Sequence, residues 1–199
     1  MAAKPSARTR RDRWADWAVI GVLIVALLLG WGVKALAEGQ RTTFTDEETG
    51  LTVRYPKDWL LKSDAKLVFQ VVDPASGDFK TTYQIRAYPI DATASLTPTL
   101  SVVLNNASLA QAQQRTAYRL FDIVEGDEIG GQPTMEATYV FVVEGNDLFV
   151  QRMPVVVRGV DIAVARGDTA YVFTLLAADS AFEDAEKAFR RFVEAAEGQ

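Results

Sequence analysis

Hydrophobic residues occur along this chain in two patterns, first as one continuous run and then as short alternating segments. The continuous run covers Trp17–Val33 and contains no charged side chain. As a helix it would be roughly 26 Å long, close to the ~30 Å hydrocarbon core of a bilayer. With a few flanking residues, the run predicts a transmembrane helix over 17–37. The alternating segments all follow it, within residues 42–199.

Positive charge is concentrated before the apolar run. Residues 1–16 contain five basic and two acidic side chains, whereas Lys34 is the only basic residue between the run and Glu38. Lysine and arginine near the end of a spanning helix stay on the cytoplasmic side of the membrane. We therefore predict a single-pass protein of the cell membrane with a cytoplasmic basic tail over 1–16, a linker over 38–41 and an extracytoplasmic domain over 42–199.

The same segment can also be interpreted as a cleaved signal peptide. Ala35-Leu36-Ala37 fits the small-residue cleavage pattern, and Arg10-Arg11 resembles part of a twin-arginine signal. However, signal peptides have an apolar core of about 7–15 residues, and Arg13 occupies a position that should be apolar. We favour the uncleaved anchor. Cleavage after Ala37 would release a secreted soluble domain, so the domain is extracytoplasmic in both interpretations.

The alternating segments predict a β-sheet. In Leu51-x-Val53-x-Tyr55 every second residue is apolar, which is typical of a half-buried strand. Turn-forming glycine, proline and aspartate separate such segments. We expect 67–72 and 81–88 to form a hairpin, and Arg166-Gly167-Asp168 to be a tight turn. The expected strands are 42–45, 51–55, 67–72, 81–88, 118–125, 135–144, 148–154, 155–157, 160–165 and 169–176.

A first helix is predicted where apolar residues recur at helical spacing after residue 96. Thr97 resembles an N-cap, with Pro98 at the first helical position. Ser108 and Gln111 have the spacing of a capping box, which indicates that the helix ends or restarts there. The apolar positions of this helix are Leu100, Val103, Leu104 and Ala107.

A second helix closes the chain. Ser180 and Glu183 have the capping-box spacing, and Glu186 with Arg190 forms an i,i+4 pair. Its apolar stripe consists of Phe182, Ala185, Phe189, Phe192 and Val193. Strands, helix, strands and helix in this order predict an α+β domain, in which helices flank an antiparallel sheet.

The composition restricts the possible functions. The net charge is −5, and because residues 1–37 contain six basic and two acidic side chains, residues 38–199 carry −9. An acidic domain repels nucleic-acid phosphates, so we exclude nucleic acid as a partner. The chain has no histidine and no cysteine. It therefore lacks the commonest general base, the commonest metal ligand and any thiol nucleophile. We expect no enzyme activity, no catalytic residue, no cofactor and no metal site.

Three groups of polar residues are candidates for catalytic or binding sites. Ser63 and Lys66 match the S-x-x-K pattern, but the companion motifs are missing, so a solvated turn is favoured. The acidic groups Asp46-Glu47-Glu48 and 125–128 lack the spacing of a calcium loop and are interpreted as charged turns. Arg166-Gly167-Asp168 spells an adhesion motif, which a hairpin turn explains equally well.

Aromatic residues provide a further candidate site. Tyr55, Trp59 and Tyr83 could line a ligand cleft, although aromatic residues on strands usually belong to the core. A module for small ligands or lipids would need such an apolar cleft. A histidine-free enzyme would instead need two carboxyl groups that converge in a pocket.

Three short motifs resemble a known family. They are Leu51-x-Val53-x-Tyr55-Pro56-x-x-Trp59, then Ile129-x-Gly131-Gln132-Pro133 with Glu136-Ala137-x-Tyr139, and Tyr171–Leu175 before the closing helix. On these motifs residues 42–195 resemble the PsbP-like superfamily, which includes the PsbP proteins of oxygenic photosynthesis and bacterial DcrB-like proteins. The resemblance implies an α/β/α sandwich around an antiparallel sheet, in proteins that mostly bind other proteins. The histidine chemistry discussed for some PsbP relatives cannot apply to this chain.

The combined pattern predicts a membrane-anchored extracytoplasmic protein-binding domain. We expect it to be an accessory or assembly subunit of a membrane protein complex, with the lipid bilayer and that complex as its partners. The alternatives are a module that binds a small ligand or lipid at the envelope, and a soluble domain secreted after cleavage of the signal peptide.

Overall fold

The structure is a computed structural model that describes residues 19–27, 29–30, 40–47, 49–91, 93–144 and 153–196. The chain divides into two compact units, Met1–Arg41 and Thr42–Gln199. The described part of the first unit is helical over 19–27 and 29–30, and its large apolar side chains are exposed. The predicted tail over 1–16 lies outside the described residues, as do 17–18, 28 and 31–39 of the predicted helix and linker. Across the described ranges, we find no helix with the length and apolar character required to span a bilayer.

The second unit is built on an antiparallel sheet, as predicted. Seven strands pair in the order β3-β4-β5-β9-β8-β7-β6, and β1 and β2 form a separate two-stranded sheet. The strands are β1 (Arg41–Thr45), β2 (Thr52–Pro56), β3 (Leu60–Leu61), β4 (Phe69–Val72), β5 (Thr82–Pro89), β6 (Thr116–Ile129), β7 (Gln132–Val143), β8 (Val155–Arg166) and β9 (Thr169–Ala178). The predicted β4–β5 hairpin is confirmed by antiparallel pairing from Phe69–Ile85 to Val72–Thr82.

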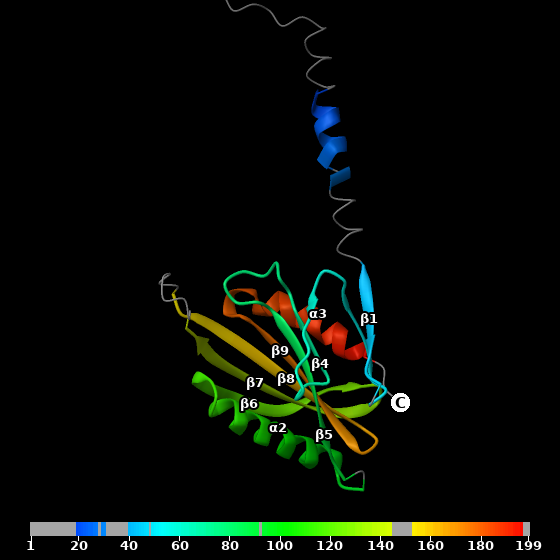
Figure 1. Cartoon of the computed structure of the whole chain (residues 1–199), viewed down its shortest axis with the longest axis vertical. Helices are drawn as coiled ribbons and strands as arrows, with labels where there is room; N and C mark the ends of the chain where they lie inside the picture. The colour runs from blue at the N-terminus through cyan, green and yellow to red at the C-terminus, as the bar shows by residue number, and fades with distance from the viewer. Residues whose placement is uncertain are drawn as a thin grey trace, which may run out of the picture. The chain divides into compact units, whose positions relative to one another are not determined.

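Two helices cover opposite faces of the large sheet (Figure 1). Helix α2 (Leu96–Ala112) packs mainly on β6, β7 and β8, and helix α3 (Phe182–Glu194) packs on β9 and β2. Alternate strand residues serve the two faces, so that Ile162 joins the core below α3 and Ala163 joins the core below α2. This arrangement is the expected sandwich of helix, sheet and helix.

The strands of the second half are longer than predicted. The predicted strands 118–125 and 135–144 leave a connecting segment between them, but β6 and β7 continue to a two-residue turn at Gly130-Gly131, where both φ angles are positive (60° and 76°). Glycine adopts this conformation without steric cost, and such turns suit the twist of a hairpin. The two strands predicted at 155–157 and 160–165 are one strand, β8. The strand predicted over 148–154 lies mostly outside the described residues.

The predicted helix caps are wrong. Helix α2 starts after Ser95, so Thr97 is already helical, and Pro98 is tolerated because first-turn N–H groups have no helical partner. The helix does not break at Ser108, which lies buried inside it. Helix α3 has Ala181 as its N-cap and no side-chain cap, because Ser180 belongs to a 3-10 turn over Asp179–Ala181 (η1).

Aromatic side chains fill the core between the sheet and α3. The Tyr83 ring lies 4.6 Å from Trp59 and 5.0 Å from Phe192, measured between ring centroids. Tyr55 and Tyr83 are buried, and Trp59 is half-buried against the same cluster. The proposed cleft lined by Tyr55, Trp59 and Tyr83 is therefore packed core. Each large buried side chain contributes roughly 1.5–3 kcal/mol of hydrophobic stabilisation.

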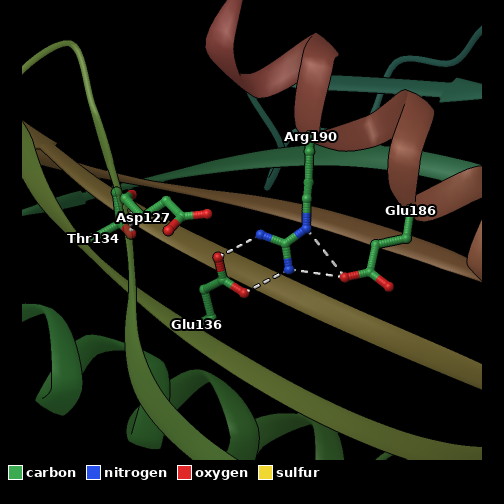
Figure 2. A network of polar contacts seen from close by, with 5 residues as sticks. All are labelled: Asp127, Thr134, Glu136, Glu186 and Arg190. Atoms are coloured by element: carbon green, nitrogen blue, oxygen red, sulfur yellow. Dashed lines mark hydrogen bonds and ion pairs between the residues drawn. The ribbon is translucent and has the colours of Figure 1, made fainter.

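An ion-pair network joins α3 to the sheet beside this core. Arg190 donates two hydrogen bonds to the carboxylate of Glu136 on β7, at 2.7 and 2.8 Å, and two to Glu186, at 2.8 and 3.2 Å. Figure 2 shows Arg190 and Glu186 reaching from α3 toward Glu136. The Glu186–Arg190 pair is thus confirmed. Hydrogen bonding to Glu136 raises the pKa of Arg190, so the guanidinium stays charged.

We expect Arg190→Ala to lower the free energy of unfolding by about 1–3 kcal/mol, because Glu136 has only 12% of its side chain exposed and would lose its charged partner. Urea unfolding of the full chain measures this loss. Lys187→Ala is the control, since its pair with Asp184 is exposed and worth little. Adding Glu136→Gln to Arg190→Ala should recover part of the loss. Equal effects of Arg190→Ala and Lys187→Ala would contradict this role of the network.

Candidate functional site

Helix α2 differs from helix α3 because it carries no charge. None of its 17 residues is acidic or basic, and Gln113 and Gln114 extend the uncharged stretch. In contrast, seven of the 13 residues of α3 are charged. A helix that faces water on one side usually carries charged residues there. The outer side of α2 is therefore the candidate contact surface.

Large apolar side chains project outward from the middle of this helix. Val102 is 59% exposed and Leu109 is 58% exposed. The exposed residues that surround them are small or carry neutral amides. We call this set the α2 surface: Pro98, Val102, Asn105, Asn106, Leu109 and Ala112. Depletion of charge together with exposed apolar groups is typical of the central part of a protein–protein interface.

A groove of about 500 Å³ runs beside the α2 surface. It lies between the helix and the end of β5, where that strand continues beyond β4. Because β4 pairs with β5 only as far as Ile85, Arg86–Pro89 has no neighbouring strand on that side among the described residues. The groove is lined by Tyr88, Pro89, Ile90, Pro98, Thr99, Val102, Val103 and Asn106. A partner that covered Val102 would also enter this groove.

The inner side of α2 is held by a buried carboxylate. Asp161 of β8 is 1% exposed and accepts hydrogen bonds from Tyr139 Oη and Gln111 Nε2, each at 3.0 Å. Gln111 belongs to the last turn of α2, and Tyr139 belongs to β7. These bonds connect the helix directly to two central strands.

A second polar contact lies one turn earlier in the helix. The Ser108 and Tyr118 hydroxyls are 2.8 Å apart, which connects α2 to β6. Arg115, just beyond the helix, lies over the Phe141 ring with its guanidinium carbon 4.0 Å from the ring centroid. The C-terminal half of α2 is therefore held in position by polar contacts, whereas Leu100 and Leu104 hold the N-terminal half by apolar packing.

A glycine makes room for the tyrosine of this network. Gly159 of β8 pairs with Tyr139 of β7, and a Cβ atom at residue 159 would lie 2.3 Å from Tyr139 Cε2. Any side chain at this position would displace the Tyr139 ring. Gly159 thus lets the ring lie flat on the strand, so that its hydroxyl reaches Asp161.

Burial determines the electrostatics of this network. It raises the pKa of Asp161 above its ordinary value, and it also raises the pKa of Tyr139. In the described part of the chain, no cationic side chain lies within ion-pair distance of Asp161. Thr174 lies beside Asp161 on β9, and Gln111 Oε1 has no hydrogen-bond partner in the same part. Because Asp161 is sealed from solvent, its role is to position α2.

Comparisons with known proteins identify the fold. No family model and no curated protein matches the sequence. Among solved structures, cyanobacterial PsbP (CyanoP) from Synechocystis sp. PCC 6803 matches with a TM-score of 0.59 at 17% identity, over 80% of this chain and 92% of that one. The Ran-binding protein Mog1p of Saccharomyces cerevisiae matches with a TM-score of 0.52 at 8% identity, over 80% and 95%. LpqN of Mycobacterium tuberculosis, described as involved in cell envelope biogenesis, matches with a TM-score of 0.50 at 14% identity, over 79% and 89%.

The domain has a PsbP-like fold. Identities this low show the fold alone. The structure places the polar groups that the sequence singled out. Ser63 and Lys66 lie on a loop whose Asp64 accepts a hydrogen bond from the Lys66 backbone N–H, so they are not on one helix face. In the described parts of the domain, no three acidic side chains gather closely enough to hold a metal ion.

Two of the other polar candidates are turns, and the third belongs to a strand, so the prediction of a charged turn at 125–128 is wrong. Asp46 Oδ2 accepts hydrogen bonds from the Thr49 backbone N–H at 2.9 Å and the Thr49 hydroxyl at 2.7 Å. Residues 125–128 lie on the edge strand β6 and not in a loop. Arg166-Gly167-Asp168 forms the β8–β9 turn, with Gly167 at φ 61°. Sequence reasoning missed the α2 surface, although an uncharged stretch over residues 96–114 was visible, and it missed Asp161, which only the three-dimensional pairing reveals.

Asp161 gives the PsbP-like domain a predictable pH dependence. Because its pKa is raised in the folded state, the folded protein binds this proton more tightly, and stability falls as pH rises from the unfolded value of 3.8 through the raised value. Asp161→Asn removes this titration. We expect the free energy of unfolding of Asp161→Asn to gain on the natural protein as pH rises above 3.8, by up to about 1.4 kcal/mol per pH unit until the raised pKa of Asp161 is passed.

Chemical denaturation at several pH values measures this difference. Asp161→Ala is the comparison, because it leaves Tyr139 and Gln111 without their acceptor and should lose about 2–4 kcal/mol. A constant difference between Asp161→Asn and the natural protein across this range would show that the carboxyl group does not titrate as described.

Proposed function

We propose that this chain is a membrane-tethered extracytoplasmic binding protein, which acts as an accessory or assembly subunit of a membrane protein complex. The observation that carries the proposal is the α2 surface. It presents two exposed apolar side chains, Val102 and Leu109, without a charged residue on the whole helix. A domain with a net charge of −9 has ample charge for its surface, so an uncharged helix indicates a surface that a partner covers.

The tether is supported by the amino-acid sequence. Trp17–Val33 is free of charge, and five basic residues precede it. The positive-inside rule then places the N-terminus in the cytoplasm and the PsbP-like domain outside. The domain begins at Thr42, shortly after the apolar run, so it would stay close to the membrane surface. Partners would therefore be membrane proteins or proteins held near the membrane.

Binding is favoured over catalysis by the chemistry of the side chains. The chain has no histidine or cysteine, and its one fully buried carboxylate, among the described residues, is committed to Tyr139 and Gln111. The descriptions of two proteins of similar structure fit this role. Mog1p is named a Ran-binding protein, and LpqN is described as involved in cell envelope biogenesis. By analogy we assign this chain to the envelope and to protein binding.

The topology can be tested because the chain has no natural cysteine. In intact cells, a membrane-impermeant maleimide should label Asp184→Cys, whose side chain is 95% exposed in the domain. The same reagent should label Ser6→Cys only after lysis. Both variants should stay with the membrane after an alkaline wash. Protection of Asp184→Cys in intact cells would overturn the proposed orientation, and a mature N-terminus at Glu38 would replace the anchor by a signal peptide.

The binding surface can be tested by photo-crosslinking in native membranes. A photoreactive amino acid at Val102 or Leu109 of the full chain should produce a covalent adduct heavier than the 21.9 kDa monomer. The same amino acid at Leu60, which is 56% exposed on the short edge strand β3, is the matched control and should produce little adduct. Equal yields from Val102 and Leu60 would show that α2 is not a protein-binding surface.

A further inference from the structure

The outward residues of α2 have the spacing of a helix–helix seam. Pro98, Val102, Asn105, Leu109 and Ala112 follow one another at intervals of four, three, four and three residues. This spacing keeps the side chains on one stripe, as at the a and d positions of a coiled coil. All five residues are exposed. The stripe fits a second helix better than it fits a loop or a flat sheet.

The two large apolar residues of the stripe are placed symmetrically. Val102 and Leu109 lie at equal distances from the midpoint between Asn105 and Asn106. When two identical helices pair antiparallel about a two-fold axis, residues at equal distances from the midpoint meet. Val102 of one copy would pack on Leu109 of the other, at both ends of the contact. The Asn105 and Asn106 amides would meet at the axis, where each can donate to and accept from the other.

The charge distribution favours a second copy as the occupant. Two domains that each carry −9 repel one another wherever their acidic surfaces meet. On the α2 surface this repulsion is least, because neither helix contributes a charge. Helix α2 has no carboxylate that would attract a basic partner. It also has no lysine, arginine or aromatic ring that would bind a bilayer surface.

We propose that α2 is a homodimerisation helix, which pairs antiparallel with α2 of a second copy about an axis between Asn105 and Asn106. This inference rests on the proposed function, since it names the partner of the same α2 surface. Tethering both copies to one membrane would raise their effective concentration and favour a modest interface. The pairing predicts which residues meet, and single cysteines can therefore map it.

Disulfide mapping on the full chain in membranes tests the pairing. Under mild oxidation Asn105→Cys should form a disulfide-linked dimer, since its counterpart lies about one residue away along the axis. Val102→Cys alone should not, because the two copies of residue 102 would be separated by seven residues, or about 10 Å. Differently tagged Val102→Cys and Leu109→Cys chains, when mixed, should cross-link to each other at least ten-fold more than either does with itself. Asp184→Cys is the exposed control and should not cross-link.

A variant that disrupts the α2–α2 contact provides a second test of the pairing. Val102→Glu with Leu109→Glu should lower the yield of Asn105→Cys dimer at least ten-fold, whereas Leu60→Glu should leave it unchanged. Efficient self-linking of Val102→Cys would overturn the antiparallel arrangement. Photo-adducts of α2 with a different protein, without any disulfide dimer, would overturn the homodimer and leave the binding role in place. The absence of both products would overturn the binding role as well.

Discussion

The hydrogen bonds around Asp161 determine where α2 sits and which of its sides faces outward. Helix α2 is uncharged, and few apolar side chains lie on its inner side. Apolar packing alone would therefore only weakly determine how the helix is rotated about its own axis. Gln111 and Ser108 remove that freedom, because each must reach a specific hydroxyl or carboxylate on the sheet. Rotation by one residue, about 100°, would leave the buried carboxylate without the Gln111 bond. An unpaired buried polar group costs about 1–3 kcal/mol.

The two faces of the sheet are stabilised in different ways. Below α3 the core consists of large aromatic rings, which include Tyr83, Phe189 and Phe192, and the ion pair of Arg190 with Glu136 lies at its side. Below α2 the sheet offers small residues such as Ala137, Ala163 and Ala165, and the large side chain Tyr139 is accommodated only because residue 159 is glycine. The α3 side therefore supplies most of the hydrophobic stabilisation. The α2 side buries less apolar surface, and its hydrogen bonds instead fix the position of the helix.

The sequence predicted what depends on local periodicity. The antiparallel sheet, the β4–β5 hairpin, the turn at Arg166–Asp168 and the apolar stripe of α3 all follow from alternation or helical spacing. The PsbP-like fold was predicted from three short motifs. The errors arise where a polar residue has two possible uses. Ser108 and Gln111 have the spacing of a capping box, but their side chains satisfy partners on the sheet, as tertiary contacts override a local signal. Nothing in the sequence indicated that Asp161 is buried. Its burial becomes apparent only when Tyr139 and Gln111 are placed beside it.

The cost of burying Asp161 is consistent with a helix whose outer surface has a function. Replacing a whole buried ionic group and its partners by well-packed apolar residues often stabilises a protein, so a buried polar network is weak evidence for stability and better evidence for a defined arrangement. Here the defined arrangement is the rotation of α2. Only at the observed rotation do Val102 and Leu109 face outward together while Leu100 and Leu104 face the sheet. An uncharged helix that was free to turn would bury its valine and leucine and present asparagine, and the outward-facing apolar pair would be lost. The buried carboxylate and the exposed apolar pair are therefore connected through the helix. Polar contacts on the inner side of α2 fix its rotation, and this rotation keeps an apolar surface exposed on the outer side.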